Sequence, residues 1–221
     1  MRSWQRGKAQ DVYMTVTDAK TDLRRYLQDA REALLWKLDG LSEYDVRRPL
    51  VRTGSNLLGL IKHQAGVELG YFGDTFGRPS AEQVTWGESD PNSDMFARPD
   101  ESREFIIDRY SRAWAHADLT ITELPLDAIG HVPWWPADRN EVTLHHILVR
   151  VATDTGRHAG QADIIRELID GAAGWTARTS NLPPGDQAWW ARYRDRVEKA
   201  AREAAGAPDT GQPGDAIHRQ D

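Results

Sequence analysis

The 221-residue sequence contains no cysteine. This absence excludes disulfide bonds, cysteine-based zinc or iron–sulfur sites and a cysteine nucleophile. Any thiol chemistry must therefore use a thiol supplied from outside the chain. Long apolar runs are also missing, since the longest are short stretches such as LLW and ILV. The sequence thus predicts neither a transmembrane helix nor a signal-peptide core, and we expect a cytoplasmic protein that does not contact membranes.

Basic residues are also fewer than acidic residues. The chain has 28 basic and 34 acidic residues, a formal net charge of −6, and its arginines are scattered along the sequence. No segment carries a basic stripe, so we expect no nucleic-acid partner. Hydrophobic residues make up 39% of the chain, enough for a sizeable core without covalent cross-links. The partner we expect is a small molecule, and a homodimer is left open.

Apolar residues recur at three- and four-residue steps in four long segments, which predicts four amphipathic helices. These helices are expected at 18–40, 53–76, 100–124 and 143–170, and a shorter one at 186–205. The expected N-caps are Thr17 or Asp18 for the first helix and Thr53 or Ser55 for the second. On the third helix the residues expected to face inward are Phe105, Ile106, Tyr110, Trp114 and Ala117. No alternating pattern typical of a β-strand is found.

The fold class predicted from this pattern is all-α: a four-helix bundle with long crossover loops and an additional C-terminal helix packed on its outside. We expect residues 1–16 to form a flexible arm, 17–205 the bundle domain and 206–221 a disordered tail. The two crossover loops, 77–99 and 125–142, are long enough to indicate a functional role.

Three polar residues lie at positions that the helical pattern assigns to the interior. His63 lies on the second helix, while Asp154 and His158 are four residues apart on the fourth and therefore one turn apart. Two ligands from one helix and a third from a facing helix can form a metal site with an open position, as in a catalytic centre. Zinc, nickel, manganese and iron all suit this ligand set, and ligand type alone does not choose among them. Zinc is the ion that we expect. A surface Asp–His pair and a core histidine without metal are the competing interpretation.

The segments KHQAGVELGYF (62–72) and LHHILVRVATDTGRHAGQADIIRELIDG (144–171) resemble the DinB-like superfamily. These metal-binding four-helix bundles include mycothiol-dependent maleylpyruvate isomerase and the bacillithiol transferases. The resemblance covers about residues 18–200 and implies that His63, Asp154 and His158 are the metal ligands. The related branch usually has Glu in place of Asp154, and His in place of Arg150 and Gln161.

The resemblance implies a metal-dependent S-transferase or isomerase that uses a low-molecular-weight thiol, with mycothiol favoured, on an electrophilic small molecule. A metal-dependent hydrolase and a non-catalytic metal- or ligand-binding bundle remain as alternatives. Glu68 is expected to form a salt bridge rather than bind the metal, and Arg150 to pair with Asp154 or another acid more than to touch substrate. The residues that we consider for the wall of a substrate pocket are Tyr71, Trp86, Trp134, Trp135 and Arg150.

Overall fold

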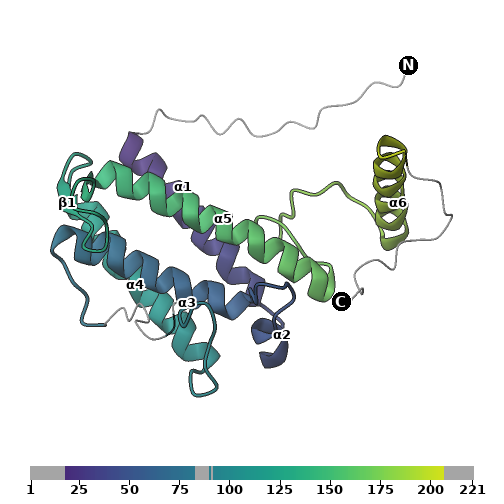
Figure 1. Cartoon of the computed structure of the whole chain (residues 1–221), viewed down its shortest axis with the longest axis horizontal. Helices are drawn as coiled ribbons and strands as arrows, with labels where there is room; N and C mark the ends of the chain where they lie inside the picture. The colour runs from purple at the N-terminus through teal and green to yellow at the C-terminus, as the bar shows by residue number, and fades with distance from the viewer. Residues whose placement is uncertain (1–17, 83–89, 91, 207–221) are drawn as a thin grey trace. The chain divides into compact units, whose positions relative to one another are not determined.

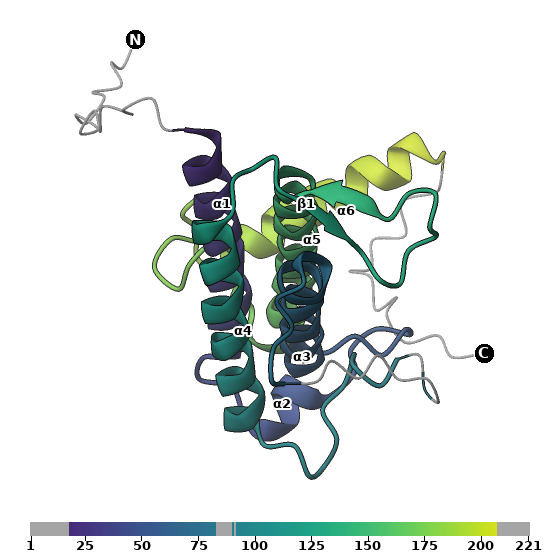
Figure 2. The ribbon, with the colours of Figure 1, turned by 90° about the vertical axis from the view of Figure 1, so that its left-hand side faces the viewer.

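The computed structural model describes residues 18–82, 90 and 92–206. It divides into two compact units, 1–180 and 181–221, and each is described by itself. The first unit is built around four long helices, α1, α3, α4 and α5, which Figures 1 and 2 show as a bundle. The all-α class predicted from the sequence is confirmed. In the part of the chain that the structure describes, no helix is both long and apolar enough to cross a membrane.

The first unit consists of α1 (Ala19–Leu35), η1 (Trp36–Leu38), α2 (Glu43–Arg47), α3 (Leu57–Glu68), η2 (Leu69–Gly73), η3 (Asp74–Phe76), α4 (Arg103–Glu123), β1 (Ile129–His131), β2 (Glu141–Thr143) and α5 (Leu144–Asp170). Here η1 and η3 are short 3₁₀ segments, whereas η2 is a π-helical turn that extends α3. The second unit contains α6 (Gln187–Ala204), and Asp186, the residue at which the sequence predicted the helix to begin, is its N-cap.

Side chains at the helix ends explain where the helices start and stop. Asp18 caps α1 as predicted, by accepting from the backbone N–H groups of Lys20 and Thr21. The cap predicted for α3 is wrong: Asn56, rather than Thr53 or Ser55, accepts from the N–H of Gly59. Gly171 ends α5 with a φ of 79°, the left-handed conformation that favours glycine.

Packing in the bundle pairs α1 with α5 and α3 with α4, and α3 also contacts α5. The core contains Leu34, Leu60, Tyr110 and Leu148, all almost fully buried. One inward assignment on the third helix is wrong, since Phe105 is 49% exposed whereas Ile106, Tyr110 and Ala117 are buried and Trp114 is partly buried against the core. Phe105 lies one residue before Ile106 and therefore about 100° round the helix from the buried stripe.

A small antiparallel hairpin precedes α5, where the sequence predicted only a loop. Strands β1 and β2 pair Ile129 with Thr143 and His131 with Glu141. Each strand has three residues, which is too short to show the alternation that identifies strands in a sequence. Thr143 also caps α5 through its side chain, so the hairpin fixes the start of the helix that carries Asp154 and His158.

Candidate metal centre

His63 on α3 and Asp154 and His158 on α5 converge in the bundle, as their spacing predicted. Each offers one ligand atom, and the three atoms lie within 4.8 Å of one another. The two imidazole rings are 5.0 Å apart between centroids and nearly perpendicular, at 74°. Nε2 of His158 is 3.6 Å from Oδ2 of Asp154. Side chains from two facing helices therefore point at one place.

Both histidines are oriented through Nδ1. Nδ1 of His63 lies 2.6 Å from Oδ2 of Asp94, and Nδ1 of His158 lies 2.7 Å from Oε1 of Gln161. Both partners are oxygen acceptors, so each Nδ1 carries the proton and donates it. The other nitrogen of each ring, Nε2, is then left with a lone pair for a ligand. A histidine held in this way by a carboxylate or amide oxygen is the usual arrangement around protein-bound metals.

The Asp154 carboxylate is held by a chain of hydrogen bonds between the same two helices. Nε2 of Gln64 donates to Oδ2 of Asp154 at 2.9 Å, and the hydroxyl of Thr155 donates to Oε1 of Gln64 at 2.9 Å. Gln64 and Thr155 are fully buried, whereas Asp154 is partly exposed. The carboxylate therefore has a fixed orientation and one side open to solvent.

The charge state of His158 suits a metal ligand. Burial lowers the pKa of His158, and the charges of His63 and Arg157 act in the same direction, while Gln161 and Asp154 oppose the shift. The net direction is downward, so the imidazole is neutral near pH 7. Neutral imidazole and ionised carboxylate are the forms that bind cations. By donor type and orientation, His63, Asp154 and His158 fit a divalent ion.

The loop segment that carries Asp94 is fastened to α3 around His63. Lys62 donates to the carbonyl oxygens of Ser93 and Phe96 and to the carboxylate of Glu101. Asn56 donates to the carbonyl oxygen of Met95 at 3.1 Å. Asp94 is therefore positioned by neighbours on both sides. Asp94 could not be identified from the sequence, because a loop residue has no periodicity that would reveal the face it contacts.

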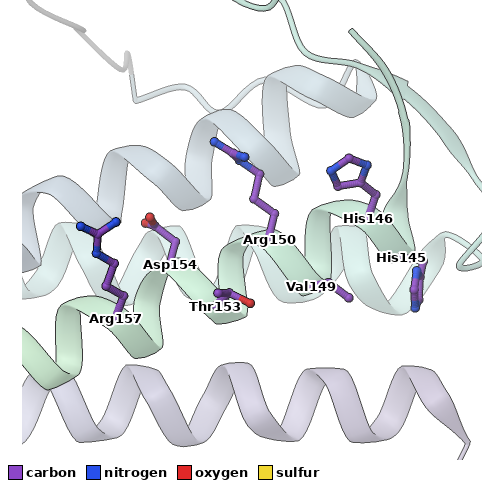
Figure 3. A pocket seen from close by; sticks show the side chains of 7 residues that line it. All are labelled: His145, His146, Val149, Arg150, Thr153, Asp154 and Arg157. Carbon is purple, nitrogen blue, oxygen red and sulfur yellow. The ribbon is translucent and has the colours of Figure 1, made fainter. Parts of the chain in front are cut away.

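A pocket of about 680 Å³ opens beside Asp154 on the exposed face of α5 (Figure 3). Figure 3 shows Arg150, Asp154 and Arg157 directed to the same side of this helix. Asp154 thus belongs both to the group of three ligands and to the pocket wall. The pocket is lined by His145, His146, Val149, Arg150, Thr153, Asp154 and Arg157.

Arg150 does not make the ion pair expected from its spacing to Asp154. Among the described residues it pairs with no acid. Its Nε donates to the hydroxyl of Tyr71 at 2.9 Å, and its guanidinium lies 5.1 Å from the Tyr71 ring and 4.8 Å from the Trp135 ring. The π-helical turn η2 contains Tyr71 and supplies this competing partner.

Three of the aromatic residues considered for the pocket wall, Tyr71, Trp134 and Trp135, form one cluster near Arg150, although none of the three is among the residues that line the pocket. The Tyr71 ring lies 5.1 Å from that of Trp134 and 6.1 Å from that of Trp135, both edge to face. The Trp134 ring packs against Gly70, where a Cβ atom would lie 2.9 Å from it. Trp86 falls outside the described residues.

Glu68 is not in the group of three candidate ligands and forms a salt bridge, as predicted. Its carboxylate accepts two hydrogen bonds from Arg31 on α1, at 2.8 and 2.5 Å, and both side chains are fully buried. Arg31 also donates to Asp118 on α4 at 2.9 Å. These ion pairs connect α1, α3 and α4 in the core.

The fold and the donor geometry together define a helical bundle with a candidate metal centre. Among solved structures, the chain is similar to a conserved protein from Enterococcus faecalis, with 15% identity and a TM-score of 0.52. That similarity covers 71% of this chain and 99% of the other, and shows the fold alone. The sequence has no match among curated proteins.

The family model of mycothiol-S-transferases matches residues 22–171. The matched range is more than half of the chain and includes all three candidate ligands. The chain therefore belongs to the mycothiol-S-transferase family, in agreement with the resemblance to the DinB-like superfamily.

Proposed function

We propose that this protein is a metal-dependent S-transferase, which joins a low-molecular-weight thiol to an electrophilic carbon of a small molecule. Mycothiol is the thiol that the family points to. The observation that carries the proposal is the convergence of His63, Asp154 and His158 within 4.8 Å beside an open pocket. The lack of cysteine in the sequence agrees with a thiol that comes from outside the chain.

In this proposal the Nε2 atoms of His63 and His158 and the carboxylate of Asp154 hold a divalent ion, with zinc favoured for this ligand set. When bound, such an ion lowers the pKa of a coordinated thiol so that the thiolate is present at neutral pH. Asp94 and Gln161 keep the two imidazoles in the required tautomer, and Gln64 keeps the Asp154 carboxylate in place.

The second substrate would lie in the pocket along α5, where Tyr71, Trp134, Trp135 and Arg150 are the residues that we propose to contact it. Arg150 lines the pocket itself, the rings of Tyr71 and Trp135 lie against its guanidinium, and Trp134 packs on Tyr71. Aromatic walls exclude water from the reacting groups and give an apolar molecule a surface to pack against.

The test is thiol transfer to monochlorobimane by the purified protein. The thiol sulfur forms a bond to the chloromethyl carbon, chloride leaves with the bonding electrons, and the thiol proton goes to solvent. We expect conjugation above the uncatalysed rate with mycothiol, loss of that activity after chelation with EDTA, and its return on adding zinc. The thiols compared are mycothiol, bacillithiol, glutathione and free cysteine.

Two results would contradict this proposal. A metal-loaded protein that gives no conjugation above the uncatalysed rate with any of the four thiols is a metal-binding bundle without transferase activity. Full activity in EDTA, at a metal content below one tenth of an ion per chain, would show that the three ligands serve another purpose. Elemental analysis of the same samples separates these two cases.

Replacing Asp94 with Asn is expected to weaken zinc binding by about 10- to 100-fold, because the charged partner of His63 Nδ1 is lost. Competition against a chromogenic chelator measures this change. Asp100→Asn is the control, since Asp100 lies in the same segment but is exposed and pairs with Arg98. Equal zinc affinity in Asp94→Asn and wild-type protein would show that Asp94 does not support the site.

A further inference from the structure

The pocket beside Asp154 carries an excess of positive charge. Its lining includes two arginines and two histidines, and Asp154 is its one acid among the described residues. In the proposed site the Asp154 charge is directed to the metal ion. Arg150 and Arg157 are then the charges that a second substrate meets on entering the pocket.

Both guanidinium groups are available to a ligand. Arg157 is exposed and, within the part of the chain that the structure describes, makes no hydrogen bond or ion pair with another side chain. Arg150 uses Nε for Tyr71, and its two terminal nitrogens have no partner among those same residues. Unpaired arginine nitrogens present a planar pair of donors that matches the two oxygens of a carboxylate.

The helix places these two groups on either side of the metal ligand. Arg150 precedes Asp154 by four residues and Arg157 follows it by three, so all three lie within about 60° on one face. Neighbours at this spacing have Cβ atoms about 5–6 Å apart. Arg150 is also held in place, because its guanidinium lies over the rings of Tyr71 and Trp135. Figure 3 shows the three side chains along this face.

We propose that the electrophilic substrate carries a carboxylate, which Arg150 and Arg157 bind while its reactive carbon faces the metal-bound thiol. This inference rests on the proposed function and adds the substrate class to it. Each arginine is about one helical turn from Asp154. This separation fits a substrate in which one aromatic ring lies between the carboxylate and the reacting carbon. Neutral electrophiles would use the aromatic contacts alone and react more slowly.

Binding of a non-reactive probe tests the pocket without any reaction. 3,5-Dinitrobenzoate has the carboxylate but no leaving group, and its methyl ester lacks the charge. In calorimetric titrations of the zinc-loaded protein without thiol, we expect the acid to bind about 10-fold more tightly than the ester. Arg157→Gln is expected to remove most of this difference and to fold normally, because the exposed Arg157 side chain makes no hydrogen bond or ion pair with another side chain among the described residues. Arg52→Gln, an exposed arginine outside the pocket, should bind like wild-type protein.

Kinetics with a matched reactive pair test the same inference in the complete enzyme. The pair is 4-chloro-3,5-dinitrobenzoate and its methyl ester; in both, the thiol sulfur replaces chloride on the ring carbon and the thiol proton goes to solvent. Each rate is divided by its uncatalysed rate. We expect the kcat/KM of the acid to fall about 10-fold in Arg157→Gln and in Arg150→Lys, and that of the ester to change less than about twofold.

The two experiments separate this inference from the proposed function. Conjugation of acid and ester with equal kcat/KM, together with equal binding of the two probes, overturns the carboxylate site and leaves the transferase standing. Tight binding of the acid probe that depends on Arg157, without conjugation of either substrate, supports the carboxylate site and contradicts the transferase. An acid preference that is the same in Arg157→Gln, Arg150→Lys and wild-type protein would show that other residues recognise the charge.

Discussion

Replacing His158 with Ala is expected to reduce zinc affinity by more than about 100-fold and to abolish metal-dependent thiol transfer. Loss of an outer partner such as Asp94 already costs about 10- to 100-fold, and a direct ligand contributes more. Two ligands would remain in His158→Ala, fewer than the three that catalytic zinc sites use. His63→Ala should behave in the same way although His63 lies on a different helix, because each ring offers one ligand atom to the same group of three.

Elemental analysis of freshly purified protein, followed by zinc competition and conjugation assays, measures both effects. His131→Ala is the matched control, since His131 is an exposed histidine on β1. It should keep wild-type metal content and activity. If His158→Ala and His63→Ala retained one ion per chain, a metal site elsewhere would have to explain the activity.

The convergence of these three candidate ligands could be predicted from the sequence because helical spacing is local. Asp154 and His158 are one turn apart in any α-helix, and the apolar residues around His63 indicated which face of its helix is buried. The bundle architecture then brings the two faces together. The partners that orient these candidate ligands depend on tertiary structure instead: Asp94 lies in a loop, and Gln64 bonds across helices to Asp154 and Thr155.

The partner of Arg150 also depends on tertiary structure and could not be predicted from helical spacing. The spacing on α5 favoured an ion pair between Arg150 and Asp154, but the partner that a side chain binds depends on every group within its reach. Tyr71 reaches Arg150 from the π-helical turn η2, whose extra residue per turn no sequence pattern revealed. The hairpin of β1 and β2 was missed for a related reason, since its pairing depends on the chain reversal between 131 and 141 rather than on residue alternation.

Replacing Arg31 with Met is expected to destabilise the bundle by about 3–5 kcal/mol, because it leaves Glu68 without its charged partner in the core. Burial lowers the pKa of Arg31, but the carboxylates of Glu68 and Asp118 raise it by more. The net shift of the Arg31 pKa is therefore upward. For a domain of this size the loss corresponds to a fall in Tm on the order of 10 °C. Thermal and urea unfolding followed by circular dichroism measure it.

Three further variants identify the source of that loss. Glu68→Gln should cost less than Arg31→Met, since Arg31 retains Asp118 and an amide oxygen as acceptors, and it should keep the metal content of wild-type protein because Glu68 is not a ligand. The double variant Arg31→Met/Glu68→Leu should recover most of the stability, because an apolar pair needs no charged partner. Arg24→Met breaks an exposed pair with the same Asp118 and should cost less than about 1 kcal/mol. If the double variant were as unstable as Arg31→Met, lost packing around Trp114 rather than the unpaired carboxylate would be the cause.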